Sequence, residues 1–269
     1  MEFYEEHLER LTLREWLRMQ SPRVLLAFYV WLMFKIRLAS VKTSISMVKG
    51  DIRERLIELD QVPEEARPRI TPILDHFAEQ GFVDLLLESY LYGRNRDHLK
   101  LVGVRILARH KSGRCVVAAP IIFGEADGSY WGESGLHTFI DAENSITSEV
   151  GSQRFDRTPG NVVTYYPECR FEELLEHHRQ TIANRGDTYV SIHNQDDMLT
   201  YMQLLENRAV QQLVQRGYLV PFEPEEGPDL PEVVDYGFKP VEAEKQPLFP
   251  GCLIFVVALI STILWKLWS

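Results

Sequence analysis

An uncharged apolar run near the C-terminal end constrains this chain more than any other part of its sequence. Residues 251–265 read GCLIFVVALISTILW, and apolar side chains on both sides extend the run to residues 248–268. A helix over these residues is about 31 Å long, which matches the hydrocarbon core of a bilayer. We therefore expect a membrane anchor here. The alternative is a buried core helix or a strand.

The ends of this run suit the two membrane interfaces. Trp265 and Trp268 lie where an aromatic belt forms, and Lys266 can extend its ammonium to the headgroups. We expect a single-pass tail anchor, with the folded part of the chain on the cytoplasmic side. Cys252, at the near boundary, is a candidate for reversible acylation, or simply a small residue that eases helix packing. The residues that we expect to hold the anchor in lipid are Leu248, Phe255, Leu259, Trp265 and Trp268.

A segment rich in proline and acidic residues precedes the anchor. Seven of the fourteen prolines and eight acidic residues lie between Pro221 and Pro250. Proline favours extended backbone and like charges repel, so residues 221–247 are expected to form a stiff linker. An ordered strap that docks through Tyr236 and Phe238 is the alternative.

Charge is segregated along the chain. The net charge of −10 excludes a general nucleic-acid binder, which needs a basic face. Between Arg10 and Lys49, however, eight basic residues accompany a single acid, Glu15. This favours a membrane surface or an acidic partner for residues 1–50. The three cysteines are odd in number and widely spaced, so we expect no disulfide framework and a reducing compartment.

A second membrane-seeking element is expected within residues 1–50. Ser21 and Pro22 are a good helix start, and residues 24–34 are apolar on every side but form only about 16 Å of helix, too short to span a bilayer. An apolar stripe at helical spacing follows, made of Phe34, Leu38, Val41, Ile45 and Val48. We expect the membrane surface to be contacted by Arg23, Trp31, Lys35, Arg37, Lys42 and Lys49.

Three interpretations of this element remain open. It can lie in or obliquely to the membrane plane, pack against partner subunits or the chain's own domain, or cross the membrane as a second span. Basic residues on both sides of residues 24–34 count against a clean span. Residues 1–19 are expected to form an amphipathic helix along the same surface.

Residues 51–220 are expected to fold as a soluble α+β domain. Its sheet is predicted to be antiparallel, with about five or six strands flanked by helices. The predicted strands are residues 83–91 (or a helix there), 102–108, 115–123, 136–140, 145–150, 161–166 and a short piece at 188–192. The predicted helices are residues 52–60, 71–81, 171–186 and 198–216.

Candidate catalytic and metal-binding motifs are weak. Glu173 and His177, four residues apart, resemble a solvated pair more than a metal site, and His178 is expected to be a core histidine. Residues 132–135, GESG, fall short of a nucleophile elbow. Cys169 with His177 or His178 does not establish a cysteine nucleophile. Residues 185–187 read RGD, like an adhesion tripeptide, but the glycine is already accounted for as the end of a helix. We therefore assign no catalytic residue, metal or cofactor.

Three functional hypotheses follow. The first is a non-enzymatic accessory or scaffolding subunit of a membrane protein complex, with the lipid bilayer and other membrane subunits as partners and no nucleic acid. The second is a membrane-surface enzyme whose site is assembled from distant residues such as Glu133, His137, Cys169 and His193. The third is a membrane-perturbing effector whose basic N-terminal helix inserts on a trigger.

Overall fold

A ten-stranded sheet organises the chain in the computed structural model, which describes residues 1–19, 24–35, 46–92, 99–123, 134–151 and 158–223. The strand order is β10-β1-β2-β4-β5-β6-β7-β8-β9, and β3 pairs with β4. The strands are β1 (Glu2–Glu6), β2 (Ser46–Lys49), β3 (Leu56–Ile57), β4 (Phe82–Tyr92), β5 (Lys100–His110), β6 (Val116–Ile122), β7 (Gly135–Phe139), β8 (Ser145–Val150), β9 (Asn161–Tyr166) and β10 (Leu219–Pro221).

The sheet is mixed, so the prediction of an antiparallel sheet of five or six strands is wrong in both respects. Every pairing is antiparallel except that of β8 with β9, which run parallel from Ser145 opposite Asn161 to Val150 opposite Tyr166. Parallel neighbours need a connection long enough to return the chain to the start of the first strand. Just before β9, Gly160, with φ +75°, accepts a hydrogen bond from Ser145 N–H, which joins the start of β9 to the start of β8.

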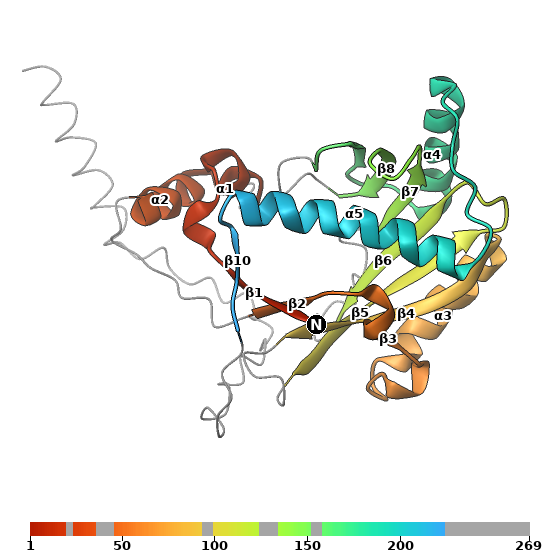
Figure 1. Ribbon diagram of the computed structural model, residues 1–269, viewed down its shortest axis with the longest axis horizontal. Helices are drawn as coiled ribbons and strands as arrows, with labels where there is room; N and C mark the ends of the chain where they lie inside the picture. The colour runs from red at the N-terminus through yellow and green to blue at the C-terminus, as the bar shows by residue number, and fades with distance from the viewer. Residues whose placement is uncertain (20–23, 36–45, 93–98, 124–133, 152–157, 224–269) are drawn as a thin grey trace, which may run out of the picture. The chain divides into compact units, whose positions relative to one another are not determined.

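Helices cover both faces of the sheet, which confirms the α+β class. They are α1 (Leu13–Met19), α2 (Val24–Lys35), α3 (Arg67–Glu79), α4 (Phe171–Arg185) and α5 (Gln195–Gln215), with short 3-10 turns η1 (Leu8–Arg10), η2 (Ile52–Arg55) and η3 (Leu59–Gln61). One face of the sheet packs against α5, and the other packs against α3 and α4. Figure 1 shows α5 lying across the strands on its side of the sheet.

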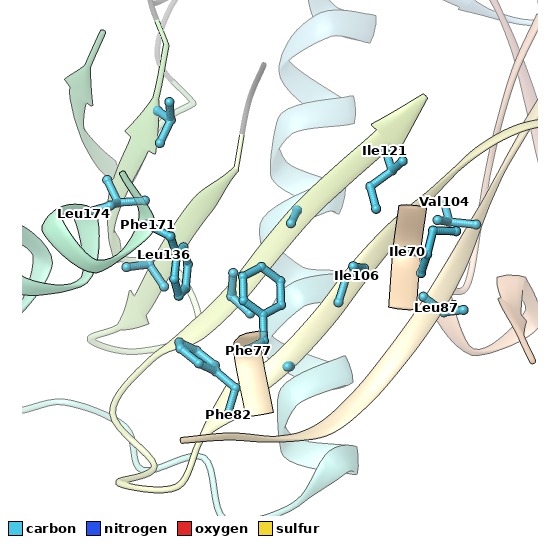
Figure 2. Close-up of a cluster of buried hydrophobic side chains, with 14 of the residues drawn as sticks. Ile70, Phe77, Phe82, Leu87, Val104, Ile106, Ile121, Leu136, Phe171 and Leu174 are labelled. Atoms are coloured by element: carbon cyan, nitrogen blue, oxygen red, sulfur yellow. The ribbon is translucent and has the colours of Figure 1, made fainter. Parts of the chain in front are cut away.

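The core on the α3–α4 side is built around three phenylalanines, which Figure 2 shows with the aliphatic side chains of the sheet beside them. The rings of Phe77 and Phe171 lie 4.7 Å apart between centroids, and Phe82 lies 5.7 Å from Phe171. Because α3, β4 and α4 each contribute one ring, this contact joins three separate elements. Tilted aromatic pairs of this kind add to the stabilisation that burial gives.

Five charged side chains lie between the sheet and α5, and we call them the buried ion network: Lys49, Arg55, Glu88, Arg105 and Glu206. Glu88 pairs with Arg55 at 2.7 Å and with Arg105 at 2.5 Å. Glu206 pairs with Arg55 at 2.9 Å, Arg105 at 3.0 Å and Lys49 at 2.8 Å. Since these residues come from β2, η2, β4, β5 and α5, the network ties residues 46–55 and α5 to the same part of the sheet.

Several local predictions differ from the structure. The helix expected over residues 1–19 is wrong in its first part, because Glu2–Glu6 is a strand paired on both edges, with β2 and with β10. The helix expected over residues 52–60 is split into η2, β3 and η3. Residues 83–91 are a strand, so the helical alternative there is wrong. Residues 188–192 form no strand and make only single backbone bonds, such as Ile192 N–H to Gly113 O.

Candidate functional site

Helices α1 and α2 form a hairpin that packs on the C-terminal half of α5. Its start is fixed locally at α1, where Thr12 Oγ1 accepts a hydrogen bond from Glu15 N–H and Glu15 Oε2 accepts one from Thr12 N–H. This reciprocal pair is a capping box, which satisfies two backbone donors that a helix start otherwise leaves free. The pattern Thr-x-x-Glu is therefore the local reason that α1 begins at Leu13.

The same carboxylate also attaches the hairpin to the sheet domain. Glu15 is fully buried, and its Oε2 lies 2.5 Å from Nη2 of Arg216, which ends α5. A buried charge is stabilised only when a partner compensates its desolvation. The Glu15–Arg216 pair therefore fixes the start of α1 against the end of α5.

Apolar packing completes this attachment. The rings of Trp16 and Phe34 stack at 5.5 Å between centroids, which joins α1 to the last turn of α2. A cluster of side chains from the hairpin, β1, β10 and α5 surrounds them, namely Tyr4, Leu8, Leu11, Val30, Trp31, Val210, Leu213, Val214, Tyr218 and Leu219. One side of α2 is therefore part of the hydrophobic core of the domain.

The other side of α2 presents apolar side chains to the outside. Val24 is 56% exposed and Phe28 is 46% exposed, and the ring of Phe28 lies 6.1 Å from that of Trp31. The helix has no charged residue before Lys35. A surface helix of a water-soluble domain normally carries a polar outer face, so this apolar face requires a different explanation. We call Val24 and Phe28 the α2 apolar face; Trp31, which packs partly in the buried cluster, lies at its border.

The structure places only some of the residues expected at the membrane surface. Trp31 and Lys35 both lie on α2, where Lys35 is exposed and its Nζ donates to Glu9 O at 3.1 Å. Lys49 lies on β2, and its ammonium pairs with Glu206 in the buried ion network. Its side chain is therefore directed into the domain. Outside the described residues lie Arg23, Arg37 and Lys42.

The predicted helical stripe through Val48 is wrong at its end. Helix α2 ends at Lys35, and Ser46–Lys49 is the strand β2, paired with β1. Outside the described residues lie Leu38, Val41 and Ile45, and also the predicted anchor with Leu248, Cys252, Phe255, Leu259, Trp265 and Trp268. Within the described residues, no helix is both long enough and apolar enough to cross a bilayer.

Two tryptophans of the hairpin contact have indole nitrogens without an acceptor. Nε1 of Trp16 and Nε1 of Trp31 are both buried and have no acceptor among the residues that the structure describes. A buried donor left unpaired costs about 1–3 kcal/mol. Trp31 therefore contributes to the hairpin through its apolar surface and not through its N–H group.

We expect Trp31→Phe to change the free energy of unfolding by less than about 1 kcal/mol, because the lost ring area is offset by removal of the unpaired donor. Urea denaturation measures this change. Phe34→Ala is the comparison, since loss of this buried, stacked ring should cost about 3–5 kcal/mol. A loss for Trp31→Phe as large as that for Phe34→Ala would show that the indole N–H does have a partner.

The residues proposed for a catalytic alternative occupy separate environments. His137 lies on β7, where its Nδ1 contacts Thr147 Oγ1 at 3.0 Å on β8. The Cys169 thiol donates to the neighbouring Arg170 O, and His193 lies at the surface before α5. Glu133 lies outside the described residues. In the part of the chain that the structure describes, no three or more His, Cys, Asp or Glu side chains are grouped as metal ligands.

His178 is a fully buried core histidine, as its position on the apolar side of α4 predicted. Thr138 Oγ1 donates to Arg114 O at 2.6 Å, so the same oxygen accepts from His178 Nε2–H at 2.9 Å. His178 Nδ1 then accepts from the Ser148 hydroxyl at 2.9 Å. Burial lowers the pKa of His178 to about 4, which keeps the ring neutral. Both nitrogens serve structural hydrogen bonds, so this ring has no free nitrogen for acid–base chemistry.

His137 is held by a hydrogen bond of one ring nitrogen, Nδ1. Thr147 Oγ1 donates to Asn161 Oδ1 at 2.8 Å, so it accepts from Nδ1–H of His137. Burial, with smaller contributions from His178 and Arg105, lowers the pKa of His137 to about 3. Burial likewise raises the pKa of the Cys115 thiol to about 12, so this cysteine is not a thiolate near neutral pH.

Comparisons with protein-family models, curated proteins and solved structures find no match to this chain.

The residues that attach the hairpin were not predicted from the sequence. The Thr12–Glu15 spacing carried a recognisable signal, because it is a capping box immediately before an apolar helix. The pairing of Glu15 with Arg216 carried none, since the two residues are 201 positions apart. Phe28 was hidden within the apolar run, where nothing local distinguishes the exposed side of a helix from the buried one.

Proposed function

We propose that this chain is a non-enzymatic accessory or scaffolding subunit of a membrane protein complex. It contacts the bilayer through the α2 apolar face and through the apolar run at residues 248–268. The observation that supports this most directly is the exposed apolar side of α2. The opposite side of α2 is fixed to the domain, because Phe34 stacks on Trp16 of α1 and Glu15 of α1 pairs with Arg216 at the end of α5.

Lipid is a suitable environment for this face. A 12-residue helix is about 18 Å long, which suits a position in the plane of the interface better than a crossing. Lys35 follows the apolar residues directly and Arg23 precedes them in the sequence, so cations are available for headgroup phosphates at both ends. Phe28 and Trp31 are of the types that partition to this depth.

A scaffolding role is supported by the character of the domain. The buried ion network, the aromatic core and the histidine hydrogen bonds each join several elements, which favours a rigid body. His178 uses both ring nitrogens within the fold, His137 uses Nδ1, and Cys115 is held as a thiol. These groups thus stabilise the domain and do not converge on a reactive centre.

Flotation of the full chain with anionic liposomes tests the membrane part of this proposal. We expect three variants to separate the two contacts: Val24→Asp with Phe28→Asp in the α2 apolar face, Leu259→Arg in the apolar run, and all three changes combined. Each set should lower the bound fraction, and the combination should lower it by roughly tenfold or more, because each buried charge costs about 2.5–3.5 kcal/mol in lipid. Val162→Asp is the control, since Val162 is a comparably exposed apolar residue on β9.

Two results would count against the proposal. If Leu259→Arg alone removed all binding and the α2 changes had no effect, the α2 apolar face would not be a membrane contact. If the chain purified from its own membrane in mild detergent ran on a native gel as a lone monomer, the role as a complex subunit would fail even where liposome binding succeeds.

A further inference from the structure

A cavity opens beside α4, on the opposite side of the sheet from α5. It has a volume of about 770 Å³ and is lined by the β5–β6 turn, the second half of α4 and the segment that follows α4. This volume is in the range of sites for small ligands. Apolar and weakly polar side chains form part of its wall, including Ile182, Ala183, Tyr189 and Cys115.

Basic side chains are grouped around this cavity. Arg114 and Arg179 line it, and Lys111 lies next to the lining residue Ser112; all three side chains are exposed and make no ion pair within the described residues. The one carboxylate of the lining, Asp187, is paired with Arg185 at 2.8 Å. In a chain of net charge −10, a group of cations with no ion pair among the described residues is a local reversal of the sign of the charge.

The end of α4 contributes less negative charge to the cavity than a free helix end does. Ile182 O is one of the last four carbonyls of the helix, which lack partners within it. Tyr189 Oη–H donates to this oxygen at 2.8 Å. The positive charges of Arg179 and Lys111 act on the lining residue His110. Burial lowers the pKa of His110 most, and these two cations lower it further.

We propose that this cavity binds a phosphate ester, whose dianionic head lies between Arg114 and Arg179 and whose organic body packs on Ile182, Ala183 and Tyr189. Guanidinium groups match the paired oxygens of a phosphate, and two of them balance a dianion. The apolar wall selects an ester over free phosphate, since inorganic phosphate leaves that wall uncovered. A soluble phosphate ester and a lipid phosphomonoester share this chemistry.

The test uses the detergent-solubilised full chain and three probes, namely phenyl phosphate, inorganic phosphate and short-chain phosphatidic acid. Calorimetry measures the affinity. The NMR titration of His110 shows whether the probe binds in this cavity, because an anion bound there should raise the pKa of the ring. We expect phenyl phosphate to saturate the cavity with a Kd below about 1 mM and inorganic phosphate to bind more weakly. Tighter binding of phosphatidic acid than of phenyl phosphate would assign the ligand to lipid, and the reverse to a soluble ester.

Variants complete the experiment. Arg179→Gln and Arg114→Gln should each weaken phenyl phosphate binding by roughly tenfold or more, because each removes a charge-assisted contact. Arg170→Gln is the control: it removes a cation from the other end of α4 that pairs with Glu173. Absence of saturable binding by all probes, or equal binding by the wild type and both cavity variants, would overturn the proposal. Liposome flotation is independent of this result.

Discussion

Glu206→Gln is expected to lower the free energy of unfolding by about 3–5 kcal/mol, because removing one member of a buried ion network leaves its partners uncompensated. In the wild type, Glu206 contacts Arg55, Arg105 and Lys49. Glutamine keeps the shape of the side chain, but it leaves Arg55 and Arg105 with the carboxylate of Glu88 and removes the carboxylate that pairs with Lys49. Urea denaturation at neutral pH measures the loss.

Asp196→Asn is the matched control for this prediction. Asp196 lies on the same helix and 3.7 Å from Arg53, but it is 85% exposed, so its loss should cost less than about 0.5 kcal/mol. Equal effects of the two substitutions would show that burial does not strengthen the interactions of Glu206. A neutral Glu206→Gln would show that the network is not an important source of stability.

The same carboxylate predicts a dependence on pH. Burial alone would raise the pKa of Glu206, but Lys49, Arg105 and Arg55 overcome this and hold it well below its usual value. A lowered carboxyl pKa gives stability that is complete above the ordinary carboxyl range and is lost as the pH falls from that range toward the lowered pKa of the folded state. Glu206→Gln should remove this part of the acid sensitivity together with the stability itself.

Helix α5 links this network to the proposed membrane contact. Glu206, in its middle, is fixed to the sheet, and Arg216, at its end, holds Glu15 of α1. Val210, Leu213 and Val214 of the same helix pack against the hairpin. Loss of the network should therefore disturb the packing of the α1–α2 hairpin on α5 as well as the core. A rigid connection of this kind suits a subunit that sets the position of a domain relative to a bilayer.

Elements with a strong local period were predicted well from the sequence. The apolar run at residues 24–34 corresponds to helix α2, Val24–Lys35. The apolar face expected on residues 171–186 is the buried side of α4, which ends at Gly186 in the left-handed conformation that favours glycine. The alternation at residues 102–108 is buried along β5. In these cases local preference and burial agree.

Elements defined by distant pairing could not be predicted in this way. Strand β1 exists because it pairs with β2 and with β10, whose residues are more than forty and two hundred positions away. Five residues carry too little periodicity to reveal such partners. Lys49 shows the same limit at the level of the site. Its charge indicated a membrane surface, whereas its position on β2 brings it to Glu206.

Acidification from pH 7 to pH 5 is expected to lower the free energy of unfolding by about 4 kcal/mol through His137 and His178, whose pKa values are about 3 and 4 in the fold against about 6.5 in the unfolded chain. Both shifts arise first from burial. The unfolded state binds protons below pH 6.5 that the folded state does not accept. Stability is therefore complete above that pH and is lost as the pH falls toward the folded values.

Urea denaturation at a series of pH values measures this loss as a slope. Two histidines of this kind should give an uptake of about two protons on unfolding near pH 5. His178→Gln should reduce the uptake by about one proton, although it also loses the Ser148 hydrogen bond. His177→Gln is the matched control, because His177 is the adjacent residue of α4 and stacks on Tyr166 at the surface. Equal stability at pH 7 and pH 5 would contradict the assignment of both rings as buried and neutral. That result would reopen them as candidates for acid–base chemistry and weaken the argument for a non-enzymatic subunit.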